Sequence, residues 1–514
     1  MSSKTKKILM AILAAVLLVG VFHVQESMNI DRDALGLTRI QPLENAPPVL
    51  AFTTVALGGF RGLISNALWI PLIWIFIIGS RPISIWFGFG SSGDSAGDPL
   101  EGSPTDGLFF QLLILAGTIV LVRRRLDWSG LFRHNRWLVV FFLYLGVSVL
   151  WSDFPLVSLK RWIKDLGNVV MVLIVLSDNQ PIRAAKILLA RCCYLLIPLS
   201  VLLIKYFPEL GRYYDQDNGS AYYSGVTLDK NLLGMTLFGC ALTLIWMVFE
   251  LFEKKTKGKW MDWPVLLFLG ALTGWLLHLA HSSTALACTL LGTLTFLGMR
   301  SRFVRNKLKH FWAYSALIMV LFLSVNTLFD LKAVTPGILG RDMSLTGRTG
   351  IWNRVLREGT DPLIGTGFYS FWSAERTKKL SAEFFYDLNE AHNGYLETYL
   401  NSGLIGVFLL FAVIFSAGNR IKMEAIKGEP FAAFRMACLL AVIPYGMTEA
   451  VFNRLSLIWF IFLLVVTEYP QRFRRGATLK SGTYREVSER SKSVRDPAAR
   501  LHLVGANNLA TSIS

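Results

Sequence analysis

The amino-acid sequence predicts an all-α polytopic membrane protein with about twelve core transmembrane helices. First, 53% of the 514 residues are hydrophobic and only 17% are charged, whereas soluble domains average about 25% charged residues. Second, the apolar residues come in blocks of about 15–22 without a charge, which is long enough to cross a bilayer. No stretch the size of an ordinary soluble domain is left between these blocks.

Residues 1–62 are predicted to be an N-terminal anchor with an extension. Lys4, Lys6 and Lys7 precede the apolar run 8–24, as in a start-transfer helix. No convincing small-residue cleavage site follows, so we expect the run to stay as an anchor. Residues 46–60 are a weak candidate span, and two alternatives stay open: either they also cross, or the anchor has an unusual orientation.

The core spans occupy residues 63–329 and 394–470, and the segment 330–393 between them is the longest polar interruption. Residues 471–514 form a basic tail that we expect to be disordered in the cytoplasm. The individual spans fall near 63–79, 107–122, 137–151, 166–177, 187–204, 232–252, 263–280, 284–299, 311–329, 395–416, 431–446 and 455–469.

The basic residues between the spans orient the helices. Cytoplasmic loops are rich in lysine and arginine, and six basic clusters fall on one side of the predicted topology. They lie at 123–136, 183–186, 253–259, 300–309, 420–427 and 472–475. The segment 330–393 is therefore predicted to be one large periplasmic loop. The net charge of +17 follows from this pattern and does not indicate nucleic-acid binding.

Neither the cysteines nor the acidic residues predict a metal centre or a cofactor. All five cysteines lie in apolar blocks without CxxC spacing, which argues against a disulfide framework and a metal site. Asp215 and Asp217 have the DxD form of metal-dependent, nucleotide-sugar glycosyltransferases. The Gly, Tyr and Asn residues around them favour a turn instead.

Several cations occur on the side that the positive-inside rule should keep free of them. Lys160, Arg161 and Lys164 lie in the outer segment 152–165. They predict contact with an anionic ligand or a lipid headgroup, and interfacial snorkelling explains them equally well.

The large loop carries the first candidate for anion binding. Residues 346–359 are predicted to form a short helix with Arg348 at its start and Trp352 on the same face. A guanidinium beside free backbone N–H groups suits a phosphate or diphosphate, and a surface arginine packed on Trp352 is an equally good interpretation. Gly365-Thr366-Gly367 predicts a turn that allows close backbone approach.

The end of the loop carries the candidate base. Asn389 is a plausible N-cap, which would place His392, Tyr395 and Tyr399 along one face at the start of a transmembrane helix. Histidine titrates near neutrality and can act as a general base toward a sugar hydroxyl. A structural histidine is the alternative.

Six short motifs lie along the chain. They are LWSDFP (150–155), GVTLDKNLLG (225–234), HSSTALA (281–287), GRTGIW (347–352), PLIGTG (362–367) and EAHNGYLETYLNSGLIG (390–406). These motifs resemble those of the O-antigen ligase and Wzy-type polysaccharide polymerase superfamily, especially its exopolysaccharide repeat-unit polymerases. The last motif is the most specific, and the order, spacing and sidedness of the six agree with the superfamily from about Leu68 to Tyr469.

The resemblance implies a GT-C-like fold and a metal-independent glycosyltransferase without a cofactor. Glycan would pass from undecaprenyl diphosphate to an acceptor hydroxyl on the periplasmic face. By motif, His392 would activate the acceptor and Arg348 would bind the diphosphate, with Arg212 and Lys230 as candidates for a second cation. The supporting residues would be Trp352, Gly365, Gly367 and Asn393.

One departure bears on the type of transferase. Ligases of this superfamily often show Ser-Arg where this chain has Ser282-Ser283, which favours a polymerase over a ligase to a lipid or protein acceptor. A lipid-linked sugar flippase or transporter is the alternative from another class. Transporters usually carry mid-membrane polar residues and related halves, and the sequence shows few such charges and no internal repeat.

The expected partners are an undecaprenyl-diphosphate-linked oligosaccharide, an acceptor glycan and the lipid bilayer, and no nucleic acid. A flippase and a chain-length regulator are candidate partners. The expected location is the bacterial inner (cytoplasmic) membrane, with a multi-pass topology and the active loop in the periplasm.

Overall fold

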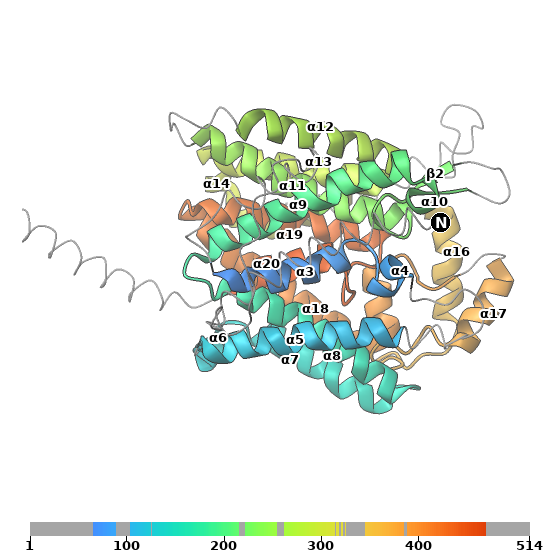
Figure 1. Ribbon diagram of the computed structural model, residues 1–514. Helices are drawn as coiled ribbons and strands as arrows, with labels where there is room; N and C mark the ends of the chain where they lie inside the picture. The colour runs from blue at the N-terminus through green and yellow to red at the C-terminus, as the bar shows by residue number, and fades with distance from the viewer. Residues whose placement is uncertain are drawn as a thin grey trace, which may run out of the picture. The chain divides into compact units, whose positions relative to one another are not determined.

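The computed structural model describes ten stretches of the chain (Figure 1). They are residues 65–88, 103–124, 126–214, 221–253, 262–313, 315–317, 320–321, 324, 345–384 and 388–468. The predicted anchor, the predicted tail, residues 330–344 of the predicted loop, and Asp215 with Asp217 lie outside them. The chain falls into two compact units, one from residues 1–126 and 135–467 and one from residues 127–134 and 468–514.

The larger unit is a helical bundle, and its helices begin where the sequence places helix starters. Proline stands in the first turn of α5, α8, α9 and α19, where its missing N–H costs nothing. Its first half contains η2 (Asn66–Leu68), α3 (Trp69–Ile78), α4 (Ile83–Phe87), α5 (Pro104–Arg123), α7 (Arg136–Val147), η3 (Ser148–Trp151), α8 (Pro155–Leu176), α9 (Pro181–Tyr206) and α10 (Pro208–Gly211).

The second half of the larger unit begins after a small β-hairpin. It contains α11 (Lys230–Glu253), α12 (Asp262–Ala280), α13 (Ser283–Arg300), α14 (Arg302–Lys307), η4 (Leu308–His310), α16 (Leu345–Leu356), α17 (Ala374–Phe384), α18 (Gly394–Ile426), α19 (Pro430–Thr448) and α20 (Leu457–Val466). In the smaller unit the described helix is α6 (Trp128–His134), where Asp127 Oδ1 accepts from the Gly130 amide at 3.0 Å.

Six described helices are long and apolar enough to cross a membrane, and a bent pair of consecutive helices raises this number to seven. The six are α5, α9, α11, α12, α18 and α19, and two further apolar helices are shorter. Each of the six contains a predicted span. The predicted count of about twelve is not confirmed, partly because α8 carries four charges in its first half and most of 311–329 lies outside the described residues.

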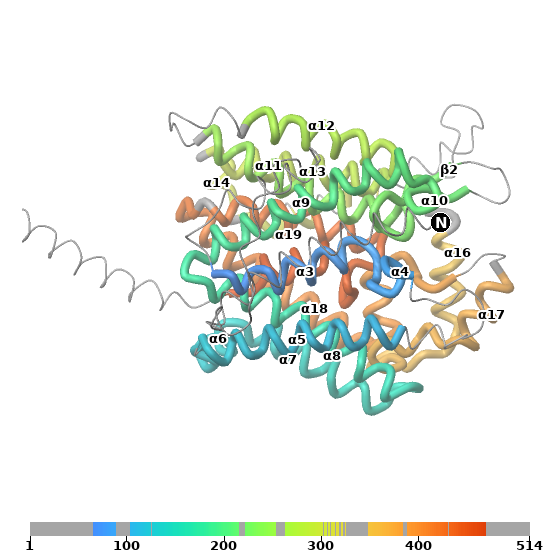
Figure 2. The backbone as a smooth tube through the Cα atoms, viewed as in Figure 1, coloured from blue at the N-terminus to red at the C-terminus, as the bar shows by residue number. Residues whose placement is uncertain are grey.

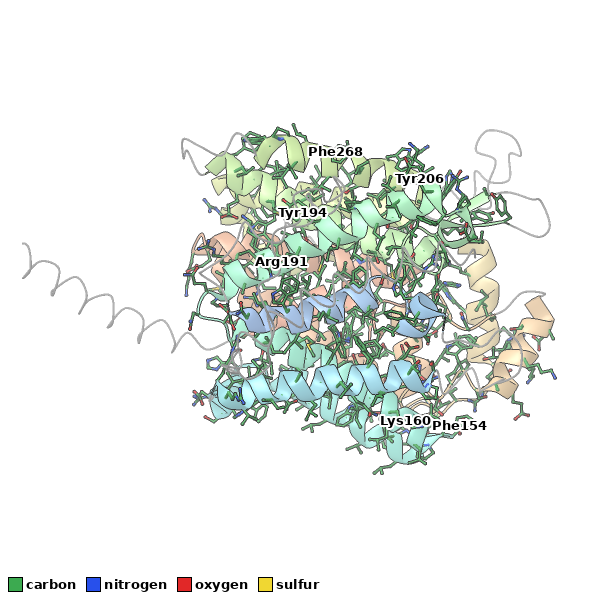
Figure 3. All side chains as sticks on the ribbon, viewed as in Figure 1. Phe154, Lys160, Arg191, Tyr194, Tyr206 and Phe268 are labelled. Atoms are coloured by element: carbon green, nitrogen blue, oxygen red, sulfur yellow. The ribbon has the colours of Figure 1, made fainter. Side chains whose placement is uncertain are left out.

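The long helices of the larger unit run side by side, and its non-spanning segments gather at the two ends (Figure 1). α10, β2, α16 and α17 lie at one end and α14 lies at the other, as the tube through the backbone also shows (Figure 2). Tyr206, at the end of α9, lies toward the end that carries α10 (Figure 3). The described residues around α10 and the hairpin therefore lie at the same end as α16 and α17.

The hairpin is the described exception to an all-helical structure. β1 (Arg212–Tyr214) and β2 (Ala221–Tyr223) are antiparallel, with Tyr213 opposite Tyr222. The two tyrosine rings lie 5.3 Å apart between their centroids. Such aromatic cross-strand pairs stabilise a short ladder, which explains a strand pair in a chain otherwise predicted to be helical.

The core centres on α20, all of whose residues are buried. A chain of polar contacts links it to two other helices: Trp459 Nε1 donates to Asp165 Oδ1 at 2.7 Å, and Trp74 Nε1 donates to Asn168 Oδ1 at 2.8 Å. Asn168 Nδ2 donates in turn to Asp165 Oδ1 at 3.2 Å. Because unpaired polar groups are costly in a core, these bonds fix α3, α8 and α20 against one another.

Candidate active site

Three segments that are distant in sequence meet at the end of the bundle that carries α16. They are the first turn of α16, residues 390–397 at the start of α18, and residues 448–454 between α19 and α20. Contacts among their charged side chains join them. The site is therefore assembled by tertiary packing and not by a single loop.

His392 lies just before α18 and has a backbone φ of 48°, in the left-handed region that few non-glycine residues adopt. Asn393 is the N-cap, and its Oδ1 accepts from the amides of Tyr395 and Leu396 at 3.0 and 3.1 Å. The prediction that Asn389 caps the helix and that His392 lies on its first turn is therefore wrong. The Asn393 cap ends the loop later than expected and leaves His392 outside the helix.

The imidazole of His392 faces two carboxylates through one nitrogen. Its Nδ1 lies 2.7 Å from Glu390 Oε1 and 3.4 Å from Glu449 Oε2. Carboxylates accept hydrogen bonds, so this nitrogen carries the proton and Nε2 is the atom that can act as a base. Burial disfavours the charged ring, but the bonds and charges of Glu390 and Glu449 outweigh it and raise the pKa of His392 to about 9.

Glu390 is in turn held by Arg454. Arg454 Nη1 is paired with Glu390 Oε2, and its Nη2 lies 3.9 Å from Glu397 Oε1. Burial alone would raise the pKa of Glu390, but Arg454, together with His392 and Arg348, lowers it to about 2. Glu390 is therefore ionised and orients the imidazole, as a carboxylate does for a catalytic histidine.

Glu397 fixes the backbone next to His392. Its Oε1 accepts from the Ala391 amide at 2.6 Å and from Trp372 Nε1 at 2.9 Å. The carboxylate thereby ties Ala391, the neighbour of the strained His392, to the helix. Such support holds an unfavourable φ in place.

Arg348 reaches the same cluster from α16. Its Nη2 lies 2.9 Å from Glu449 Oε1, and its Nη1 donates to the carbonyl of Thr448. Arg348 lies in the first turn of α16, as predicted. The structure thus places Arg348 and His392 on the two oxygens of one carboxylate.

Trp352 anchors α16 to the segment before His392. Its Nε1 donates to the Ala391 carbonyl at 2.8 Å. The ring packs against a buried cluster on α16, α17 and α18 and the loops between them. The contacts of Arg348 with Glu449 and Thr448 account for the position of its guanidinium. Packing on Trp352, the other interpretation of Arg348, is not needed to explain that position. The cluster consists of Ile351, Val355, Phe371, Leu380, Leu388, Ala391 and Leu400.

The predicted glycine turn braces α18 from outside. Gly365 and Gly367 have φ of 67° and 94°. A Cβ on Gly365 would lie 2.6 Å from the Asn401 carbonyl carbon, and one on Gly367 would lie 2.6 Å from the Ser152 Cα. Both positions therefore need glycine, and their role is close backbone packing below the site.

The residues just before this turn also accept hydrogen bonds from the backbone at a break in α18. Gly403 has a φ of 62° inside the helix, and the amides of Leu404 and Ile405 donate to the carbonyls of Pro362 and Leu363 at 2.9 and 3.2 Å. A break in an apolar helix is tolerated where neighbouring groups satisfy the freed backbone. The loop is thereby locked to the helix that begins at the site.

The two candidates for a second cation lie on and beside the hairpin. Arg212 Nε donates to the Ile204 carbonyl at 2.8 Å, and Lys230 Nζ lies 4.1 Å from the centroid of the Tyr222 ring. The neighbouring Asp229 lies within electrostatic reach of the site: burial raises its pKa, and Glu390 and Glu449 add to the effect. Diphosphate binding by Arg212 or Lys230 stays a prediction.

Sequence reasoning missed Glu449, Arg454 and the role of Glu390. Glu449 and Arg454 are the charged residues between the predicted spans 431–446 and 455–469. The predicted topology already placed this short connection on the side of the large loop. That signal could have identified both as site residues.

Glu390, His392 and Glu449 also offer three possible metal ligands, whose atoms lie within 4.8 Å of one another. The donor set fits a divalent ion poorly. Each carboxylate already carries an arginine partner, Arg454 on Glu390 and Arg348 on Glu449, and a bound cation would be repelled by both guanidiniums. Metal independence stays a prediction.

Comparison with known proteins identifies relatives of this chain. Residues 265–411, which include Arg348 and His392, match the model of the family described as O-antigen ligase. The chain is also 26% identical over 333 residues to the exopolysaccharide production protein ExoQ of Rhizobium meliloti (strain 1021). That alignment covers 61% of this chain and 72% of the relative.

Proposed function

We propose, because residues 265–411 match the model of the O-antigen ligase family, that this membrane protein polymerises glycan carried on undecaprenyl diphosphate. The observation that carries the proposal is the meeting of Arg348 and His392 on Glu449. A cation suited to a diphosphate and a nitrogen suited to proton abstraction then lie side by side. The name of the relative, an exopolysaccharide production protein, favours polymer growth over transfer to a lipid or protein.

The reaction moves one glycosyl group. The acceptor hydroxyl attacks the anomeric carbon of the donor, a new C–O bond forms, and the bond between that carbon and the diphosphate oxygen breaks. The diphosphate leaves with the electron pair, and the acceptor proton passes to Nε2 of His392. The leaving group is already good, so the protein's work is orientation, charge neutralisation and removal of one proton.

Arg348 is the group that would meet the diphosphate. Guanidinium binds phosphate oxygens in a planar, bidentate fashion that an ammonium cannot reproduce. The side chain of Arg348 is 26% exposed, whereas that of its partner Glu449 is 3% exposed. The arginine can therefore be reached by a ligand while its counter-ion lies behind it.

His392 is the proposed base and spends most of its time charged. With a pKa of about 9, roughly one imidazole in a hundred is neutral at pH 7. The neutral form is correspondingly basic, and Glu390 keeps its proton on Nδ1 so that Nε2 receives the next one.

The proposed sidedness puts this end of the bundle in the periplasm. The basic segment α14 lies at the other end (Figure 1), as the positive-inside rule requires of a cytoplasmic loop. The donor headgroup and the acceptor would then both approach from the periplasmic surface.

The test is a reconstitution of the purified protein with lipid-linked repeat units, with and without a chelator. Growth of the glycan that survives chelation is expected. Translocation of the lipid-linked sugar in vesicles without new glycosidic bonds would instead assign the protein to the flippases. Growth that stops on chelation and returns with added metal would overturn metal independence.

A further inference from the structure

Glu449 occupies a central and rigid position in the candidate site. Its amide donates to the Tyr445 carbonyl at 3.0 Å, and its carbonyl accepts from the amides of Gly394 and Val451 at 3.0 and 2.9 Å. These bonds tie residue 449 both to the end of α19 and to the first residue of α18. The carboxylate therefore stands at a fixed place relative to His392.

The carboxylate divides its two oxygens between the two proposed functional residues. Oε1 pairs with Arg348 at 2.9 Å and Oε2 faces His392 at 3.4 Å. A phosphate oxygen would seek the same guanidinium N–H groups. Glu449 and a diphosphate thus compete for one partner.

The balance of charges at the site makes this competition important for diphosphate binding. Three carboxylates, those of Glu390, Glu397 and Glu449, face Arg348, Arg454 and the protonated His392. The three cations are matched by the three carboxylates, and the Asp229 carboxyl lies within electrostatic reach of them, so the cluster offers little net positive potential to an approaching diphosphate. Binding must therefore draw on cations that are already paired.

We propose that Glu449 is a positioning residue that sets the donor affinity by competing with the diphosphate for Arg348. With donor bound, Arg348 exchanges part of its interaction with Glu449 for the diphosphate. After transfer, the carboxylate reclaims the guanidinium and favours release of the lipid diphosphate. This inference rests on the proposed function, since it needs Arg348 to be the diphosphate ligand.

If Glu449 competes with the diphosphate, removal of its charge should increase the affinity for a diphosphate. General damage to the site would lower that affinity instead. Glu449→Gln keeps the shape and one oxygen but removes the charge, so the guanidinium becomes more available. A charge-assisted hydrogen bond is worth enough to change an affinity by about tenfold. We expect the variant to bind inorganic pyrophosphate about tenfold more tightly, with a lower KM for donor.

The experiment is calorimetric titration of inorganic pyrophosphate into the purified full-length protein in detergent, with parallel polymerisation kinetics. Glu358→Gln is the matched control, because Glu358 also pairs with an arginine of α16, Arg354, and with Lys379 at 3.2 Å. The control should leave the affinity unchanged. Glu449→Asp keeps the charge and should return the affinity toward the wild-type value.

Variants of Arg348 and Glu449 distinguish failure of the competition from failure of the proposed function. If Arg348→Ala weakens pyrophosphate binding but Glu449→Gln does not tighten it, the competition is wrong while the proposed function stands. If Arg348→Ala leaves pyrophosphate binding unchanged, Arg348 is not the diphosphate ligand, and the proposed function loses its anion site. If the Gln variant does not fold, the kinetics of Glu449→Asp decide: KM and kcat close to wild type support the competition, and a higher KM with unchanged kcat overturns it.

Discussion

Arg348 and His392 share one counter-ion. Arg348 Nη2 lies 2.9 Å from Oε1 of Glu449, and His392 Nδ1 lies 3.4 Å from Oε2 of the same side chain. The carboxylate thereby holds a residue of α16 and a residue before α18 close to each other.

Removal of the imidazole should cripple transfer without removing the protein from the membrane. General-base help is worth about 10²–10⁴-fold in rate, so His392→Ala should lower kcat by about that factor in the reconstituted assay. The exposed His310, in η4, provides the matched control as His310→Ala. Normal polymerisation by His392→Ala would show that His392 is structural.

The rate should increase with pH up to about 9. The active form of His392 is neutral, and its pKa is raised from 6.5 to about 9, so each pH unit below 9 should reduce the rate about tenfold. Glu390→Gln removes the closest of the carboxylates that raise this pKa, and it should move the profile toward lower pH. A rate that is flat between pH 6 and 8 in the wild-type protein would exclude His392 as the base.

Arg348→Lys should lose most activity although it keeps the positive charge. Both terminal nitrogens of Arg348 are in use, one on the Thr448 carbonyl and one on Glu449, and an ammonium cannot reproduce this fork. The matched control is Arg354→Lys on the same helix, where the arginine pairs with Glu383 at the surface. Wild-type kinetics in Arg348→Lys would make Arg348 a structural residue.

Arg454→Ala should destabilise the fold. It would leave the carboxylates of Glu390 and Glu397 without their shared cation, a loss of about 3 kcal/mol for a largely buried pair. Thermal unfolding in detergent measures the effect. Arg357→Ala removes an exposed arginine that follows α16 directly, and it should change stability by less than about 0.5 kcal/mol. Equal melting temperatures for the two variants would contradict the prediction.

Gly403→Ala tests the break in α18. A Cβ at this position would collide with the Leu363 backbone, and the φ of 62° disfavours any side chain. We expect a lower melting temperature together with reduced activity, because the turn at Pro362 and Leu363 would be displaced from the helix. Gly107→Ala is the control, because a Cβ on Gly107 meets nothing within 4 Å. An unchanged melting temperature in Gly403→Ala would show that the break is not required.

Apolar blocks predicted the positions of the long helices well, because the length and composition of an apolar run are local properties of the sequence. The predicted span 263–280 begins one residue after α12 and ends with it, and the predicted span 284–299 differs by one residue at each end from α13. The start of α18 was harder to predict, since Asn389 and Asn393 can both act as N-caps. Only the packed structure shows that Asn393 caps the helix and that His392 stays outside it.

The candidate site was only partly visible in the sequence. Arg348 and His392 could be selected because each stands in a polar loop with a recognisable motif. Glu449 and Arg454 stand in a short connection without such a motif, and their importance arises from contacts with residues far away in the chain. Long-range ion pairs of this kind are set by tertiary packing, which a single sequence does not reveal.

The place of Glu449 and Arg454 in the chain has a consequence for biosynthesis. Arg348 and His392 emerge from the ribosome before the residues that complete their ion pairs, which follow α19. A nascent chain that has inserted its membrane helices as far as α18 still holds these charged groups without Glu449 and Arg454. Insertion of α19 and the segment after it therefore closes the site.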